Sequence, residues 1–245
     1  MNSERYIRQI EIPEIGEDRQ SLLEDASVLV IGAGGVGTTV LYDLAAAGVG
    51  TIGIADHEIV KMSNLNRQFI HFEEDIGSLK VHSAAKKLRQ FNSEINIIPH
   101  ATAVNKDNAY ELISQYDVVV LTVDNAQARM IVNEACVELG KPFAYGQCGG
   151  VIGACCFVEP GKTPCLACIY GTAEPPEERF SSCSPVVSVI GGLASAAVLS
   201  HLFGKENPLA GNIITYNATT ATFEKIPVEK KKDCAICAVQ EDTEA

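Results

Sequence analysis

The sequence contains no run of about 18 consecutive apolar residues, the length that a membrane-spanning helix needs. Its first residues, MNSERYIRQIEIPEIGEDRQ, are charged throughout and lack the apolar region of a signal peptide. Basic residues are also scarce: 19 Lys and Arg stand against 31 Asp and Glu, a formal net charge of −12. Because nucleic-acid phosphates bind basic surfaces, this balance argues against nucleic acid as the main partner. We therefore expect a cytoplasmic protein without membrane contact.

Short β-branched runs alternate with longer helical patterns over the first two thirds of the chain. Strands are predicted at 27–31, 51–55, 95–99, 117–121 and 142–146, and helices near 36–47, 79–91, 107–114 and 126–139. This alternation indicates a mainly parallel sheet covered by helices on both faces. The expected fold class is therefore α/β and Rossmann-like.

From about residue 150 the pattern changes, and the runs at 150–160, 211–217 and 221–228 resemble strands of an antiparallel extension. The apolar segment 184–203 predicts a buried helix, in which two glycines indicate a kink or a close contact. The only low-complexity segments are short: AEPPEER at 173–179, a predicted mobile loop, and the acidic QEDTEA at the end.

No internal repeat is found and no second independent domain is required, so we expect one domain over residues 1–245. Its nucleotide-binding core would cover 27–147. The remainder, 148–245, would contain the antiparallel extension, a crossover loop and the cysteine-bearing tail.

The nucleotide site is predicted from a glycine motif, Gly32-x-Gly34-x-x-Gly37, which directly follows a predicted strand and opens a helix. Glycines, here including Gly35, let the backbone approach a phosphate, and a helix N-terminus offers N–H groups and a positive dipole. Asp56 ends the next strand, where a carboxylate can bind ribose hydroxyls. The alternative is a glycine-rich turn that binds no ligand.

The glycine motif alone favours a dinucleotide such as NAD, but the residues that follow favour ATP. Asn64, Arg67 and Gln68 come just beyond the second strand, and Lys80 begins the next helix. A guanidinium and an ammonium near a glycine loop suit a triphosphate, whose charge rises in the transition state. The alternative is that Arg67 and Lys80 are solvated surface charges.

Asp124 follows the fourth predicted strand at the same edge of the sheet. Mg²⁺ usually binds through one or two carboxylates together with phosphate oxygens, so Asp124 is a candidate Mg²⁺ ligand. The alternative is that Asp124 or Asn125 caps the following helix, and the two roles can be divided between these residues.

Four of the nine cysteines form two C-x-x-C pairs, Cys165 with Cys168 and Cys234 with Cys237. Two such pairs can hold a tetrahedral Zn²⁺ through four thiolates, which leaves no open position for catalysis. Zinc would then tie the tail to the body of the protein. A redox-active pair is the alternative, although that function needs one pair near a helix N-terminus rather than two.

Cys183 follows the loop 173–179 and precedes the predicted buried helix. A helix N-terminus favours the thiolate, so Cys183 is a candidate nucleophile, and a role without chemistry is the alternative. The four other cysteines lie in helix or strand patterns and are predicted to be buried: Cys136, Cys148, Cys155 and Cys156.

Together these motifs resemble the ThiF/MoeB/HesA family of ubiquitin-activating-type adenylyltransferases. The resemblance rests on RYIRQ, GAGGVG, the aspartate after the second strand, SNLNRQ, GSLK, VDN and the two C-x-x-C pairs, in the family's order from about residue 5 to 237. It implies that Asp124 serves the metal. It also implies that ribose and phosphates are bound by Asp56, Asn64, Arg67, Gln68 and Lys80.

Two further roles follow from the resemblance alone. Arg8 would reach the γ-phosphate in the other subunit of a homodimer, and Cys183 would form a covalent link with the activated partner during sulfur transfer. The family pattern places several residues between this cysteine and the next proline, whereas only Ser184 separates Cys183 from Pro185 here.

The implied reaction is ATP- and Mg²⁺-dependent adenylation of the C-terminal glycine of a small ubiquitin-like sulfur carrier (ThiS- or MoaD-like) that ends in Gly-Gly. It would serve thiamine or molybdopterin biosynthesis or a related sulfur-transfer pathway, with a separate sulfur donor. One alternative is an NAD-dependent oxidoreductase on the same core, which leaves SNLNRQ and GSLK unexplained. The other is a non-catalytic protein-binding homologue, which should lack some of Arg67, Lys80, Asp124 and the glycines.

Overall fold

The computed structural model describes residues 3–171 and 181–238; the loop predicted at 173–179 and the acidic tail lie outside these residues. The helices are α1 Ser3–Ile10, α2 Gly16–Asp25, α3 Gly35–Ala47, α4 Lys80–Phe91, α5 Ala109–Ser114, α6 Ala126–Glu138, α7 Leu166–Tyr170 and α8 Ser184–Leu202, with short 3₁₀ helices η1 Met62–Asn64 and η2 Glu73–Asp75. The strands are β1 Ser27–Ile31, β2 Thr51–Ala55, β3 Asn96–His100, β4 Val118–Leu121, β5 Phe143–Gly149, β6 Ile152–Val158, β7 Asn212–Asn217 and β8 Thr222–Pro227.

These strands form a single sheet in the order β3-β2-β1-β4-β5-β6-β7-β8. The pairs from β3 to β5 are parallel, and the pairs from β5 to β8 are antiparallel. The central strands are continuous apolar runs because both faces of the sheet are covered, as the full burial of β4 illustrates. The predicted fold class, a mainly parallel sheet with an antiparallel extension, is confirmed.

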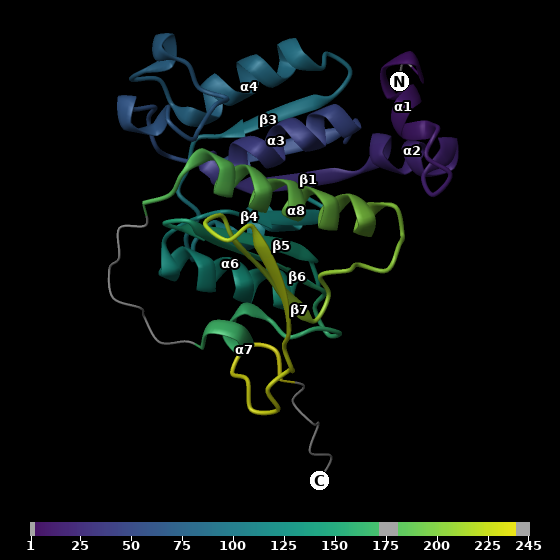
Figure 1. Cartoon of the computed structure of the whole chain (residues 1–245), viewed down its shortest axis with the longest axis vertical. Helices are drawn as coiled ribbons and strands as arrows, with labels where there is room; N and C mark the ends of the chain where they lie inside the picture. The colour runs from purple at the N-terminus through teal and green to yellow at the C-terminus, as the bar shows by residue number, and fades with distance from the viewer. Residues whose placement is uncertain (1–2, 172–180, 239–245) are drawn as a thin grey trace.

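Helices α3, α4 and α8 cover one face of the sheet, and α5, α6 and α7 cover the other (Figure 1). Alternate residues of each central strand feed the two cores: Val28 and Val30 face the first layer, whereas Leu29 and Ile31 face the second. The cysteines of both C-x-x-C pairs belong to the second core. The zinc candidates are therefore separated by the sheet from α3 and α8.

Among the described residues, α8 is the one helix long and apolar enough to cross a membrane. Its apolar side chains, including Val186, Ile190 and Val198, are instead buried in the core that it shares with α3 and the sheet. A Cβ on Gly191 would lie 2.5 Å from Cβ of Thr39, so this glycine allows α8 to approach α3 closely. The buried helix and its close contact are thus confirmed.

The strand order switches direction at β1, which pairs with β2 on one side and with β4 on the other. The helices that follow β1 and β4 lie on opposite faces of the sheet. In open α/β sheets, ligands bind at the carboxyl ends of the strands beside such a switch point. The glycine motif and Asp124 both lie at this place.

Candidate active site and metal centre

Two glycines shape the turn between β1 and α3. Gly32 has a φ of +102°, a conformation that side chains disfavour. A Cβ on Gly37 would lie only 2.0 Å from the carbonyl oxygen of Gly32, so any side chain is excluded there. Thr122, just after β4, donates from Oγ1 to the same carbonyl at 2.9 Å. The turn is therefore fastened to the switch point, with the N-terminus of α3 at the carboxyl edge of the sheet.

Asp56 follows β2 and holds this glycine turn. Its Oδ2 accepts the N–H of Ala33 at 2.8 Å, and its Oδ1 accepts the N–H of Glu58 at 2.8 Å. A carboxylate oxygen can accept a second hydrogen bond, so the fixed Asp56 can still receive the hydroxyls of a ribose. The structure thus brings Asp56 and the glycine motif together.

Gln68 provides a test of whether these residues fit a nucleotide. Its side chain is only 4% exposed, and its Oε1 has no hydrogen-bond partner among the described residues. Its Nε2 lies 3.8 Å from the position that a Cβ on Gly34 would take. Because buried polar atoms nearly always have partners, an orphaned amide oxygen beside the glycine turn suits a donor of a bound ligand. The adenine amine and the ribose hydroxyls are such donors, so the residues fit a nucleotide.

Asn64 and Arg67 lie in the segment between β2 and α4. Oδ1 of Asn64 accepts the N–H of Lys61 at 2.9 Å and so closes the η1 turn. The half-buried Arg67 donates from one nitrogen to the carbonyl of Ser63 at 3.1 Å and to Oδ1 of Asn66 at 2.8 Å. Both acceptors are neutral, and the remaining guanidinium donors can bind a phosphate.

Lys80 is the first residue of α4 and is only 2% exposed, so the alternative of a solvated surface charge does not apply to it. Its Nζ lies 2.5 Å from Oε2 of Glu58, whose side chain is half exposed. The hydrogen bond and charge of Lys80 outweigh burial and lower the pKa of Glu58. A triphosphate at this site would share the Lys80 ammonium with that carboxylate.

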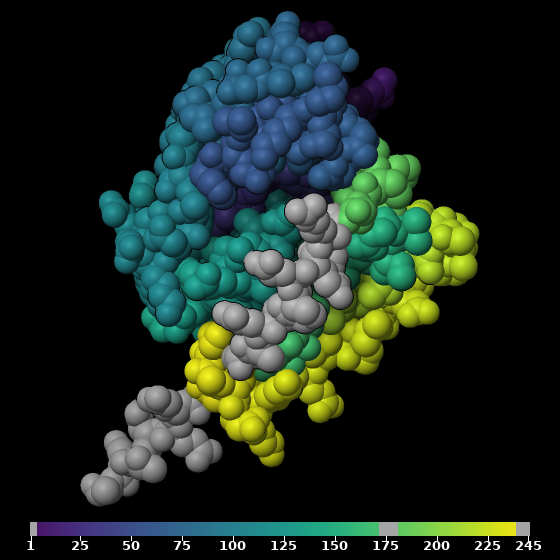
Figure 2. Space-filling model, turned by 90° about the vertical axis from the view of Figure 1, so that its left-hand side faces the viewer, coloured from purple at the N-terminus to yellow at the C-terminus, as the bar shows by residue number. Residues whose placement is uncertain are grey.

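Asp124 and Asn125 divide the two roles considered for them. Oδ1 of Asn125 accepts the N–H of Ala128 at 2.9 Å and caps α6. Asp124 is exposed at the carboxyl edge of the sheet, where it is accessible to a cation. In Figure 2, purple atoms from the early part of the chain are visible in a recess between blue atoms above and teal atoms below.

Arg8 does not join these residues within one chain. Its side chain is 90% exposed and pairs with Glu11 at 3.0 Å. The neighbouring Gln9 donates to the carbonyl of Ala47, the last residue of α3, whereas the glycine turn lies at the opposite end of that helix. Thirteen helical residues span roughly 20 Å. Figure 1 likewise shows α1 beside α2, which leads into the amino end of β1.

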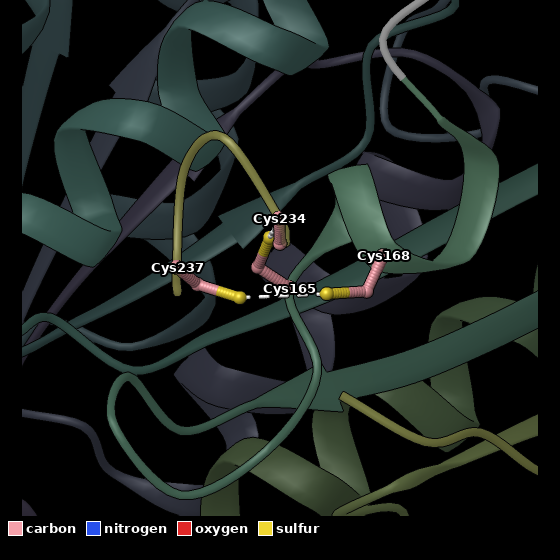
Figure 3. Close-up of side chains that lie close together, drawn as sticks. All are labelled: Cys165, Cys168, Cys234 and Cys237. Atoms are coloured by element: carbon pink, nitrogen blue, oxygen red, sulfur yellow. Dashed lines mark hydrogen bonds between the residues drawn. The ribbon is translucent and has the colours of Figure 1, made fainter. Parts of the chain in front are cut away.

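The four cysteines of the two C-x-x-C pairs meet in one cluster (Figure 3). Their sulfur atoms all lie within 4.8 Å of one another, and all four residues are buried. Sγ of Cys165 is 3.7 Å from that of Cys234, and Sγ of Cys168 is 3.4 Å from that of Cys237. Four sulfurs bound tetrahedrally at about 2.3 Å would be about 3.8 Å apart, so the cluster fits Zn²⁺.

The surroundings do not act alike on these thiols: burial raises the pKa of Cys165 and Cys237, whereas the pKa of Cys234 is lowered. Although burial raises the pKa of Cys234, hydrogen bonds from the backbone of Cys237 and Ile236 and from neighbouring thiols lower it to about 7. The N–H of Lys231 donates to Sγ of Cys168 at 3.4 Å. Such partners orient metal ligands and stabilise their charge.

Cys183 is the N-cap residue of α8 and is half-buried, with Pro185 in the first turn of the helix. Cys136, Cys155 and Cys156 are buried as predicted, whereas Cys148 is only half-buried. Burial raises the pKa of Cys148 to about 12, and the nearby Cys183 adds to the shift. Cys148 is therefore a poor nucleophile at neutral pH.

A second buried polar cluster was not foreseen from the sequence: His71, Asp75, Ser83 and Lys87, all at most 7% exposed. One signal was available. Ser83 and Lys87 are four residues apart on the face of α4 that also buries Val81 and Ala84. Polar side chains on a buried helix face require partners, and these partners lie in the loop before α4.

Comparison with known proteins identifies the family of the chain. The profile of the ThiF family matches residues 6–236. A "Sulfur carrier protein adenylyltransferase" from Thermus thermophilus is 36% identical over 247 residues, which cover 96% of this chain and 90% of that protein. An "Adenylyltransferase and sulfurtransferase MOCS3" from Culex quinquefasciatus is 36% identical over 241 residues, 96% of this chain and 55% of the relative. The chain thus spans about half the length of such MOCS3 relatives.

Solved structures agree on the fold. MccB of E. coli, crystallised with ATP, superposes with a TM-score of 0.84 at 24% identity, over 97% of this chain and 75% of that one. A second MccB structure, with MccA-N7isoASN, gives a TM-score of 0.86 at 23% identity over the same shares. Because the family profile covers nearly the whole sequence, the chain belongs to the ThiF family.

Proposed function

We propose that this protein is an adenylyltransferase that uses ATP and Mg²⁺ to activate the C-terminal glycine carboxylate of a small ubiquitin-like sulfur carrier protein. The observation that carries the proposal is the orphaned Gln68 oxygen beside a glycine turn that Asp56 holds in place. The likeness to a sulfur carrier protein adenylyltransferase over 90% of that relative's length supports the choice of substrate.

In the proposed reaction the glycine turn and the N-terminus of α3 bind the phosphates, while Asp56 and Gln68 orient the nucleoside. A carboxylate oxygen of the carrier forms a bond to the α-phosphorus in line with the leaving group. The bond from that phosphorus to the bridging oxygen breaks, and pyrophosphate leaves with the electron pair. The product is an acyl-adenylate. Because a carboxylate is already a nucleophile, positioning and electrostatic stabilisation suffice.

The charge that develops on pyrophosphate needs nearby cations. Arg67 has guanidinium donors beyond its two bonds to neutral oxygens, and the buried Lys80 is held at the same edge by Glu58. Mg²⁺, when bound, would neutralise phosphate charge, and the exposed Asp124 would hold it together with phosphate oxygens. Zinc in the four-cysteine cluster would be structural, because all four positions are filled by sulfur.

The proposed assembly is a homodimer with two active sites. Arg8 lies on α1, and Gln9 beside it contacts the far end of α3 from the glycine turn. Its exposed guanidinium can therefore serve an ATP site only in another copy of the chain. A partner's Arg8 would add a third cation at the pyrophosphate.

The acyl-adenylate is reactive enough for a thiol or a sulfur donor to attack it, with release of AMP. Cys183, half-buried at the start of α8, is the proposed residue for a covalent link to the carrier. We propose that a separate protein donates the sulfur. The pathway, thiamine or molybdopterin biosynthesis or a related sulfur transfer, is defined by the carrier that this enzyme accepts.

The test is exchange of labelled pyrophosphate into ATP, measured with several small carriers that end in Gly-Gly. Exchange should require Mg²⁺ and one carrier, and should disappear when the two glycines of that carrier are removed. Arg67→Ala should lower the rate by about 10²–10³-fold, the usual effect of losing one transition-state donor. Cys183→Ser is the matched control, because adenylation precedes any step at that thiol and its rate should persist. Absence of exchange with every carrier would refute the proposal.

A further inference from the structure

A series of buried hydrogen bonds, here called the relay, runs beneath the glycine turn from α4 to the carbonyl oxygen of Ala33. Nζ of Lys87 donates to Oγ of Ser83 at 3.1 Å, and Oγ of Ser83 lies 2.8 Å from Nδ1 of His71. Nε2 of His71 lies 3.3 Å from the carbonyl oxygen of Ala33. The three side chains are 7%, 4% and 3% exposed, and none has a part in the reaction proposed above.

The two ends of the relay, the Lys87 ammonium and the Ala33 carbonyl, determine where its protons lie. An ammonium group can only donate a hydrogen bond, and a carbonyl oxygen can only accept one. A neutral imidazole carries a single proton, which must therefore be on Nε2, where it is donated to Ala33. Nδ1 then accepts the hydroxyl proton of Ser83.

His71 is neutral at pH 7 because of its surroundings. Burial lowers its pKa, and the ammonium groups of Lys80 and Lys87 lower it further. The carbonyl of Ala33 and the carboxylate of Asp75 act in the opposite direction without cancelling the effect. These groups come from the glycine turn, from η2 and from α4, the elements that surround the ring.

Lys87 is itself held in a defined orientation. Its ammonium pairs with the buried carboxylate of Asp75 and lies 4.6 Å from the centre of the Phe72 ring. Asp75 also accepts the N–H of Phe72 at 2.6 Å, and a hydrogen bond from Ser83 helps to lower the pKa of its carboxyl. The relay is thus anchored in the η2 turn, next to the segment that carries Gln68.

We propose that His71 is a positioning residue whose neutral Nε2–H tautomer sets the orientation of the peptide group between Ala33 and Gly34. The proposal rests on the proposed function in one respect, that the glycine turn binds the phosphates of ATP. Asp56 accepts the N–H of Ala33 at 2.8 Å, so Ala33 is held at both of its polar backbone groups. Because a trans peptide is planar, the N–H of Gly34 points away from the carbonyl of Ala33 and hence away from His71. His71 thereby keeps this N–H directed out of the buried relay, toward a ligand.

Two substitutions separate the donor from the bulk of the ring. His71→Gln keeps an N–H near the position of Nε2, whereas His71→Leu has a similar volume and no donor. ATP affinity, measured by calorimetry on folded protein, should stay within about 3-fold for the Gln variant and fall about 10-fold for the Leu variant. Equal affinity of wild type and the Leu variant would overturn the proposal, and so would an equal loss in both variants.

The tautomer gives a second, independent readout. Long-range ¹H–¹⁵N correlation of the imidazole should show His71 neutral and protonated on Nε2 at pH 7. Ser83→Ala removes only the hydroxyl that donates to Nδ1, so it should increase the share of the Nδ1–H tautomer and weaken ATP binding about 3-fold. A charged ring at pH 7, or an Nδ1–H tautomer in the wild type, would contradict the inference. This measurement needs no nucleotide; if the wild type bound no ATP, the proposed function would fail while the tautomer still tested the relay.

Discussion

The four-cysteine cluster leads to a prediction about the tail that carries Cys234 and Cys237. Ordering the roughly 11 residues after β8 costs on the order of 10–20 kcal/mol in backbone entropy. Apart from Cys234 and Cys237 themselves, the side chains that this segment adds to the core are the partly buried Ile236 and Ala238, which contribute a few kcal/mol at most. Structural zinc binding is worth about 10–16 kcal/mol at pH 7, which is enough to offset the difference. Without zinc the tail should therefore detach while the sheet remains folded.

Hydrogen exchange of the tail amides is the measurement, with bound zinc quantified by mass spectrometry. Purified protein should contain about one zinc per chain and protect the amides near Cys234. Chelation, or Cys234→Ser, should release the metal and remove this protection, while the amides of β1 and β4 stay protected. Cys148→Ala is the matched control, because this half-buried thiol lies outside the cluster and its loss should leave zinc in place. The reasoning would be refuted if the tail amides stayed protected in zinc-free protein, or if a Cys165–Cys234 disulfide held the tail instead of zinc.

Three further outcomes are expected. In urea unfolding, Gly192→Ala should stabilise the protein by about 1 kcal/mol, because the added Cβ would meet no atom within 4 Å. Gly191→Ala should destabilise the protein by about 1–3 kcal/mol, because its Cβ would clash with α3. Asp75→Asn should cost about 3–5 kcal/mol by leaving the Lys87 charge buried and unpaired. Although burial raises the pKa of Asp75, the bonds from Lys87 and from the backbone lower this pKa overall in the folded protein. The carboxylate therefore stabilises the fold fully above about pH 4, and this stabilisation is lost as pH falls through the lower folded pKa. The Asn variant should lack this acid-dependent loss of stability. Arg8→Ala should leave the melting temperature unchanged but abolish pyrophosphate exchange. Mixing this variant with one inactivated in the glycine turn should restore exchange activity in hybrid dimers, an outcome that a monomer cannot give.

The parallel core was predictable because burial on both faces makes its strands continuous apolar runs. The bounds of β1 and β2 agree with the prediction to the residue. β5 extends to Gly149, three residues beyond the predicted end, because pairing with β6 continues through Gln147 and Cys148. That extension depends on a neighbouring strand and has no local signal. Helices α1, α2 and α7 were not predicted; α7 spans only five residues and begins within a C-x-x-C pair.

Site residues were predictable in position but not in environment. The sequence places Lys80 at the start of a helix, but its burial and its pairing with Glu58 depend on how the loop before α4 folds back. The relay through His71 was missed for the same reason, because its contacts join residues 12 and 38 positions apart. The cysteine cluster was the exception: a sulfur set repeated at C-x-x-C spacing indicates a shared metal even when the two pairs are distant in sequence.

The distance between those pairs also bears on how the protein is made. Cys165 and Cys234 are 69 residues apart, and the segment between them includes α8 and the β7–β8 hairpin. At a synthesis rate of about 5–20 residues per second, roughly 3 to 14 seconds separate the appearance of the first pair from that of the second. During this interval Cys165 and Cys168 have thiols but no complete metal site. Zinc coordination by the four cysteines would therefore be among the last tertiary contacts to form, in chains whose sheet strands have all been synthesised.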